Sequence, residues 1–208
     1  MTSPGAADRL DLLDWKRRVF DTYAEIRASS VSQASWSRWR SVRDDLFANH
    51  PQSPIPSPER RRFSGLPYFD YERAARTTAE VVDSKPEHYD IATSGETVGS
   101  YGFTRFGVAQ FELFGEALEL ELYWLDGYSG GLFLPFRDGT SGKETYGAGR
   151  YLFDTVKGAD LGMEGDRLVL DFNFAYNPSC AYDPRWVCPL APYPNRLEAP
   201  IRAGERYG

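Results

Sequence analysis

The stretch FRDGTSGKETYGAGRY, residues 136–151, concentrates glycines and polar side chains near the middle of the chain. Backbone N–H groups in such a run, together with the guanidinium groups of Arg137 and Arg150, are suited to hold a carboxylate or a phosphate. The spacing does not fit a nucleotide-binding P-loop, because Lys143 is followed by Glu144 where Ser or Thr is required. The simpler interpretation is a wide hairpin loop in which the glycines adopt positive φ and Arg137 pairs with Asp138 or Glu144.

A second polar stretch, DFNFAYNPSCAY, occupies residues 171–182. Asp171 and Asn173 alternate with two phenylalanines, so in a strand they would share one face. That face would meet water if the phenylalanines fill the core, or would line a pocket if the sheet encloses one. Asp171 would then act as a general base, provided that partial burial raises its pKa. Asn177 falls in the turn that ends the stretch.

Two cysteines, Cys180 and Cys188, are the only thiols in the chain. No further cysteine or histidine lies near them in the sequence, so we expect no metal site. Cys180 would serve as a nucleophile if a neighbouring group lowered its pKa. Buried packing thiols and a redox pair are the open alternatives. The signatures of a serine hydrolase and of a zinc-binding helix are missing.

The first quarter of the chain has the apolar periodicity of helices. Apolar residues recur every three or four positions over residues 8–28, and again from Trp36 to Leu46, which predicts two helices. Ser35 or Ser37 is the expected N-cap of the second helix. The proline-rich segment 51–58 ends it.

Beyond residue 75 the apolar period changes to that of strands, with turn residues between them and no helical segment. The pattern predicts an α+β protein that is mainly β, with N-terminal helices and an antiparallel barrel or sandwich of about eight strands. We expect a helical arm and linker at 1–58 and a β domain at 59–208, packed as one unit. The predicted strands are 77–82, 89–93, 101–106, 108–114, 118–124, 132–136, 150–155 and 168–174, with a hairpin turn at Phe114-Gly-Glu.

Several motifs together resemble a known family. They are WRSVRDDLF (39–47), FSGLPYF (63–69), the two polar stretches above, CPLAP (188–192), NRL (195–197) and Gly204-Glu. The chain is similar in these segments to bacterial and archaeal proteins catalogued as domain of unknown function 1684 (DUF1684). Pro194 departs from the acidic residue that the family pattern has there. The resemblance implies no activity, but it implies that the polar residues belong to a shared motif, namely Arg137, Asp138, Thr140, Gly142, Thr145, Tyr146, Arg150, Tyr151, Asp171, Asn173, Asn177 and Cys180.

The motif favours a polar pocket for a small anionic or polyhydroxylated molecule, with hydrolase-like chemistry as an extension of binding. The alternative is a non-catalytic structural or interaction module whose polar residues pair with one another. The expected ligand-binding residues are Arg137, Asp138, Thr145, Tyr146, Arg150, Tyr151, Asn173 and Asn177, and the expected catalytic residues are Asp171 and Cys180.

The composition sets further expectations. A net charge of −6 argues against nucleic-acid binding, which needs a basic surface. We see neither a secretion signal nor a run of about 20 apolar residues, so we expect no membrane association and a cytoplasmic protein. No motif calls for a cofactor, and either a monomer or a homodimer fits the sequence.

Overall fold

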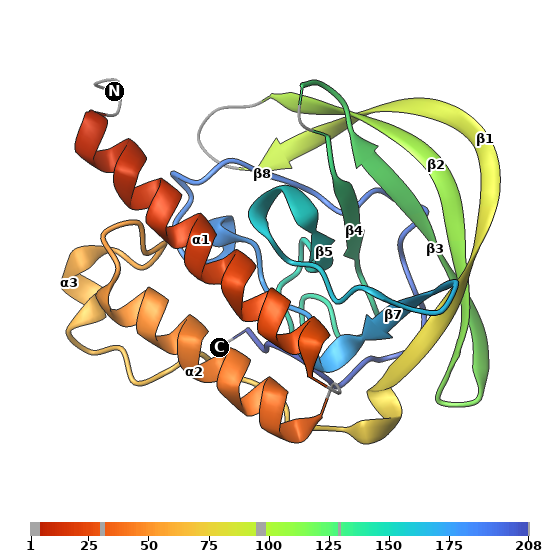
Figure 1. Cartoon of the computed structure of the whole chain (residues 1–208), viewed down its shortest axis with the longest axis horizontal. Coiled ribbons are helices and arrows are strands. Elements are labelled where there is room, and N and C mark those ends of the chain that lie inside the picture. Colours follow the sequence, from red (N-terminus) through yellow and green to blue (C-terminus); the bar gives the residue numbers. More distant parts are fainter. Residues whose placement is uncertain (1–4, 30–31, 95–98, 129, 208) are drawn as a thin grey trace.

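Two antiparallel helices lie side by side against a curved sheet (Figure 1). The computed structural model describes residues 5–29, 32–94, 99–128 and 130–207. The helices are α1 (Ala6–Ala28), α2 (Gln33–Asn49) and the single turn α3 (Ser57–Arg60).

Helix α2 starts earlier than the sequence suggested. The predicted N-cap, Ser35 or Ser37, is wrong, because the Ser32 hydroxyl accepts from the Ser35 backbone N–H (3.4 Å). Ser35 completes the cap in return, since its hydroxyl oxygen accepts from the Ser32 N–H at 2.8 Å. This reciprocal pair satisfies two donors that a helix terminus would leave free.

The strands form one antiparallel sheet in the order β5-β4-β3-β2-β1-β7-β6, with β8 added to the far end of β1. Among the described residues β5 and β6 do not pair, so the sheet is open and is not a closed barrel. The mainly β, antiparallel fold with N-terminal helices is therefore confirmed. The strands are β1 (Arg76–Ser94), β2 (Ser100–Leu113), β3 (Glu116–Leu125), β4 (Leu132–Phe136), β5 (Arg150–Asp154), β6 (Met163–Glu164), β7 (Arg167–Asp171) and β8 (Cys188–Pro189).

Four of the predicted strands merge into two long ones. Strand β1 runs through 77–93 with a register shift between Asp83 and Glu87, and β2 runs through 101–113 with a shift between Arg105 and Gly107. A β-bulge interrupts the alternation of side chains and bends the strand without ending it. The break in the sequence pattern was therefore interpreted as the end of a strand, although the strand continues through it. The predicted hairpin at Phe114 is confirmed, because Leu113 pairs with Glu116 across the turn.

The stretch from residue 168 to 174 is not one strand. Strand β7 ends at Asp171, and Phe172–Phe174 form a 3₁₀ turn. The interpretation that one face holds the polar residues and the other the phenylalanines is therefore wrong. Asp171, Phe172, Asn173 and Phe174 are all fully buried.

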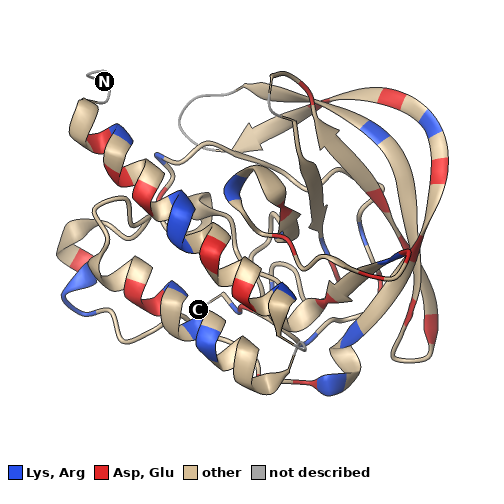
Figure 2. Cartoon of the chain, viewed as in Figure 1, with Lys and Arg blue, Asp and Glu red and all other residues tan. Residues whose placement is uncertain are grey.

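One hydrophobic core joins the helices to the sheet. Trp39 of α2 packs edge-on against Phe174 with ring centroids 5.2 Å apart, and Tyr23 of α1 belongs to the same cluster. Charged residues lie along α1 and α2 in both signs (Figure 2). Among the described helices, none combines the length and apolar character needed to span a membrane.

At Gly149, next to Arg150, the backbone conformation and the surrounding atoms leave no room for a side chain. Its φ is +102°, and a Cβ there would lie 2.6 Å from the Phe136 carbonyl oxygen. We predict that Gly149→Ala lowers the free energy of unfolding by about 3 kcal/mol, because it adds a backbone clash to left-handed strain. Gly115→Ala is the matched control, since its φ is +81° and nothing lies within 4 Å. Gly115→Ala should lower the free energy of unfolding, measured in urea, by about 1 kcal/mol. Equal losses of unfolding free energy in Gly149→Ala and Gly115→Ala would contradict the predicted clash.

Candidate functional site

Arg150 opens β5 with its side chain in the interior, 1% exposed. Its Nη2 donates to Asp138 Oδ2 (2.8 Å) and to the Ile201 carbonyl (3.0 Å). Its Nη1 donates to the carbonyls of Ala203 and Glu205. Burial lowers the pKa of Arg150, and the Asp138 carboxylate opposes that shift. These contacts occupy both terminal nitrogens of the guanidinium and bind the C-terminal segment to the sheet, whereas Nε is buried without a partner among the described residues.

The glycine-rich stretch is folded around Asp138. The Thr140 N–H donates to Asp138 Oδ1 at 2.7 Å, and the Thr140 and Thr145 hydroxyls are 2.8 Å apart. Arg137 lines a surface depression with Lys143 and Arg196, and Asp138 contributes to the wall of the same depression. The structure therefore brings together Asp138, Thr145 and Arg150, with Arg137 beside Asp138 at this depression.

Asn173 connects three segments. Its Nδ2 donates to the Glu72 carbonyl (2.8 Å), its Oδ1 accepts from the Glu72 N–H (2.9 Å), and its own carbonyl accepts from Trp36 Nε1 (2.9 Å). Asp171 Oδ1 in turn accepts from the Asn173 N–H and Nδ2. Burial raises the pKa of Asp171 to about 6, although these hydrogen bonds oppose the shift. The carboxyl is shielded completely from solvent.

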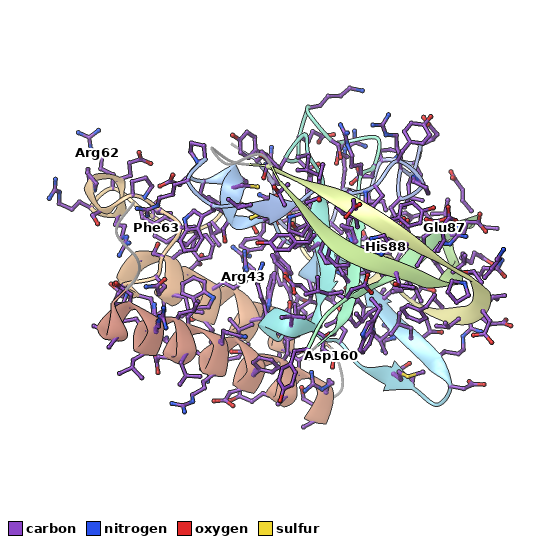
Figure 3. The ribbon with its side chains drawn as sticks, turned by 90° about the horizontal axis from the view of Figure 1, so that it is seen from above. Arg43, Arg62, Phe63, Glu87, His88 and Asp160 are labelled. Atoms are coloured by element: carbon purple, nitrogen blue, oxygen red, sulfur yellow. The ribbon has the colours of Figure 1, made fainter. Side chains whose placement is uncertain are left out.

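An ion pair between the partly buried Arg43 and the fully buried Glu205 links the helical arm to the C-terminal segment. Arg43 Nη2 of α2 donates to Glu205 Oε2 at 2.7 Å, and Arg43 Nε donates to the Tyr68 hydroxyl at 3.0 Å. Glu205 also accepts from the Asn177 N–H (3.0 Å) and from the Tyr182 hydroxyl. Burial raises the pKa of Glu205, and Arg43 is the main opposing influence. Figure 3 shows Arg43 between the helices and the strands.

A cavity of about 80 Å³ lies beside this ion pair, between α1, α2, β5 and the segment 176–179. Two polar atoms of its wall residues, the Tyr23 hydroxyl and Asn177 Oδ1, are buried and have no hydrogen-bond partner within the described part of the chain. Burial raises the pKa of Tyr23, so its hydroxyl stays protonated; Arg43 and the Trp39 side chain oppose the shift, but Trp39 makes no contact with the hydroxyl that meets the geometry of a hydrogen bond. The lining residues are Trp15, Val19, Thr22, Tyr23, Trp39, Val42, Arg43, Leu46, Phe47, Tyr151, Asp154, Lys157, Ala159, Tyr176, Asn177, Pro178 and Ser179.

Two of the sequence-predicted residues, Tyr151 and Asn177, reach this cavity. The Tyr151 hydroxyl donates to the Pro189 carbonyl, so that its ring is fixed in the wall. Tyr146 and Cys180 lie apart from the cavity lining and contact each other, with the phenol oxygen 3.9 Å from Sγ.

Sequence reasoning missed Arg43, although a signal was present. Arg43 follows Trp39 and precedes Phe47 by four residues each, so it lies on the apolar stripe of α2. Its guanidinium carbon lies 5.0 Å from the Trp39 ring centre and 5.0 Å from that of Tyr176. A charged residue on the buried stripe of a helix indicates an oppositely charged partner in the protein interior, and here that partner is Glu205.

Residues 61–206, more than half of the chain, match the profile of a family described as "Protein of unknown function (DUF1684)". The chain belongs to the DUF1684 family. The resemblance inferred from the motifs is thereby confirmed. A comparison with curated proteins found no match.

A solved structure is similar to this DUF1684 chain along most of its length. It is the solution NMR structure of the uncharacterized protein from gene locus rrnAC0354 of Haloarcula marismortui, with 37% sequence identity and a TM-score of 0.60. The alignment covers 84% of this chain and 93% of that one. The family profile begins at residue 61, so Tyr23 and Arg43 lie outside the matched segment of the DUF1684 chain.

Removing the Arg150 charge should destabilise the protein strongly. We predict that Arg150→Met costs about 3–5 kcal/mol of unfolding free energy, because Asp138 would be left buried without its partner. Arg202→Met is the matched control: it breaks the Arg202–Glu144 bridge, in which Arg202 is 61% exposed. We expect this control to change the urea unfolding curve little, because an exposed ion pair is screened by solvent. A comparable loss of unfolding free energy in both variants would show that the buried Arg150–Asp138 pair matters no more to stability than an exposed ion pair.

The ionisation of Asp171 should weaken the fold as the pH rises. Its folded pKa of about 6 exceeds the ordinary 3.8, so the folded state binds the proton more tightly. The unfolding free energy should therefore fall between these two pKa values. Relative to wild type, Asp171→Asn should gain about 2–3 kcal/mol between about pH 4 and pH 8. Denaturant unfolding at both pH values measures this gain, and a pH-independent difference would contradict it.

Proposed function

We propose that the protein binds a small polyhydroxylated molecule in the cavity between the helical arm and the sheet. The observation that carries the proposal is that the Tyr23 hydroxyl and Asn177 Oδ1, which belong to two residues lining one cavity, have no hydrogen-bond partner among the described residues. Buried polar atoms are nearly always hydrogen-bonded in folded proteins, so an unpaired donor and an unpaired acceptor favour a guest that supplies both roles. A hydroxyl group does so.

The charges around the cavity favour a neutral ligand over an anion. Arg43 is already paired with Glu205, and Lys157 Nζ lies 3.2 Å from Asp154 Oδ2. An added carboxylate would face Asp154, and Arg43 and Lys157, the cations of the described lining, are both already paired with acids. A polyol carries no charge, and its C–H groups can pack on the rings of the wall while its hydroxyls donate and accept.

The size of the cavity limits the ligand. About 80 Å³ accommodates a molecule with a carbon chain on the order of three or four atoms, or one end of a larger sugar. Neither Asp171 nor Cys180 lines the cavity, so the proposal is limited to binding and assigns no reaction.

A second candidate is the non-catalytic structural module. The observation that favours it is the Arg150 cluster, in which Asp138 and three backbone carbonyls occupy both terminal nitrogens of the guanidinium. In this case the polar motif holds the C-terminal segment in place and the cavity contains only water. The two candidates differ in whether any ligand stabilises the protein.

Thermal unfolding and calorimetry with glycerol, erythritol, ribose and lactate test the proposal. The polyols and the sugar should raise the melting temperature by mass action, and lactate should not. Tyr23→Phe should weaken polyol binding by about five- to tenfold through the loss of one hydrogen bond. The ligand-free variant should be as stable as wild type or slightly more so, because an unpaired buried hydroxyl is removed.

Tyr193→Phe is the matched control, since Tyr193 is 79% exposed. It should change neither stability nor binding. Stabilisation by lactate alone, or unchanged polyol affinity in Tyr23→Phe, would overturn the proposal. The absence of any stabilising polyol would favour the structural module.

A further inference from the structure

A surface depression of about 230 Å³ lies directly after β4 and carries an excess of positive charge. The cations of its described lining are Arg137 and Lys143 of the glycine-rich stretch and Arg196 of the NRL segment. The acids of the lining are Asp138, which is buried, and Glu198, which is exposed. The depression is therefore positive, although the whole chain has a net charge of −6. A positive hollow of this kind attracts anions.

The backbone places two of these arginines side by side. The Arg137 N–H donates to the Asn195 carbonyl, and the Leu197 N–H donates to the Arg137 carbonyl, both at 2.8 Å. The two bonds form a parallel bridge in which Arg137 pairs with Arg196. Residues paired in this way present their side chains on the same face. Like charges directly opposite each other repel, so an anion between the two guanidinium groups would relieve a repulsion that the fold imposes.

The segment that carries Arg196 is fixed by the side chain of Asn195. Its Nδ2 donates to the carbonyls of Pro135 (2.8 Å) and Glu121 (3.0 Å), and its Oδ1 accepts from the Glu121 N–H (2.8 Å). The guanidinium carbon of Arg196 lies 5.1 Å from the ring centre of Tyr193, which limits the positions of the side chain. Because these contacts already hold the cation in place, an anion that binds there loses less of its binding energy to ordering the site.

The acids next to these cations in the sequence are engaged by other groups. Asp138 Oδ2 accepts from Arg150 Nη2 at 2.8 Å, so the charge of Asp138 is balanced in the interior. Glu144 Oε1 accepts from Arg202 Nε at 3.0 Å. Within the described part of the chain, no carboxylate forms an ion pair with any of the three cations of the depression. All three are therefore available to a bound anion.

A hydroxyl donor belongs to the same wall. Ser141 lines the depression, and its Oγ accepts from the Asp138 N–H at 3.1 Å. No described residue accepts the proton of this hydroxyl, which leaves it free to donate to a ligand. Two guanidinium forks, an ammonium and a hydroxyl make up a donor set that suits the oxygens of a phosphate.

We propose that this depression is a binding site for a phosphate dianion, either free or as the end group of a small ester. Arg137 and Arg196 donate to the phosphate oxygens, and Lys143 and Ser141 complete the set of donors. Three cations face one exposed acid, Glu198, which leaves an excess of two positive charges. A phosphate monoester carries a charge of about −1.5 to −2 near pH 7 and balances this excess, whereas a single carboxylate leaves half of it unbalanced.

The phosphate site is independent of the proposed polyol cavity, because the two share no lining residue. Its volume of about 230 Å³ is below the range of about 300–1,000 Å³ that is typical of pockets for drug-sized ligands. The depression therefore holds the phosphate group and little more, and the remainder of a larger ester would extend into solvent.

Isothermal titration calorimetry of the full chain at constant ionic strength tests the site, with methyl phosphate, inorganic phosphate, sulfate and acetate as probes. Methyl phosphate lacks free alcohol groups, so its binding cannot be attributed to the polyol cavity. Both phosphates should bind, and acetate should bind at least about tenfold more weakly. Equal affinities for the two phosphates would identify an ester site, and a strong preference for inorganic phosphate would identify a site for the free ion.

The pH dependence tests the charge of the ligand without any substitution. A phosphate monoester loses its second proton near about pH 6, so the affinity for methyl phosphate should rise between pH 5 and pH 7.5. Sulfate is a dianion over this whole range, and its affinity should not rise. A parallel rise for both anions would show that the protein and not the ligand titrates, and would contradict dianion selection.

Matched variants test the two arginines. Arg137→Gln and Arg196→Gln should each weaken methyl phosphate binding by about tenfold, through the loss of a charge-assisted hydrogen bond. Without ligand, neither variant should melt below wild type, because each one relieves the repulsion between the two guanidinium groups. Arg62→Gln is the control, since Arg62 is exposed and lies outside the lining of the depression. This control removes the same charge and should leave the affinity unchanged.

Three results would overturn the inference. The first is a wild-type chain that binds neither phosphate, or that binds acetate equally well. The second is an equal loss of affinity in all three variants, which would show that only the net charge of the protein matters. The third is a lower melting temperature of both ligand-free depression variants together with unchanged affinity, which would assign the arginines a structural role.

Discussion

The ion pair between Arg43 and Glu205 is the interaction on which the arrangement of this protein depends. It connects helix α2 to the C-terminal segment inside a core of aromatic rings. A buried ion pair adds little net stability, but an unpaired member is costly, so such a pair favours one docking position over its alternatives. The arm is therefore held at the position that forms the cavity beside Tyr23 and Asn177.

A second buried arginine completes this arrangement from the other side. Arg150 fixes the carbonyls of Ile201, Ala203 and Glu205 to β5, and Glu205 then presents its carboxylate to Arg43. The C-terminal segment is thus bound between the sheet and the arm by two guanidinium groups. Arg150, a residue of the polar family motif, thus holds the C-terminal segment in place, and the helical arm supplies part of the cavity wall.

Much of the fold could be predicted from the sequence, because helices and hairpins are encoded locally. The period of α1 and α2 and the turn at Phe114 are of this kind. The failures lie where tertiary contacts decide. A curved strand resembles two strands in sequence, and the buried 3₁₀ turn at Phe172–Phe174 depends on Asp171 accepting from Asn173. The polar residues of the motif were identified, but the sequence did not show that Arg150 would be occupied by Asp138 and by the carbonyl of Ile201, which lies 51 positions away.

A high-resolution crystal structure of the protein soaked with erythritol tests directly whether the cavity binds a polyol. One polyol should lie in the cavity between the arm and the sheet, with hydroxyls within hydrogen-bond distance of the Tyr23 oxygen and Asn177 Oδ1. A cavity that holds only water, or a polyol bound elsewhere on the molecule, would contradict this expectation.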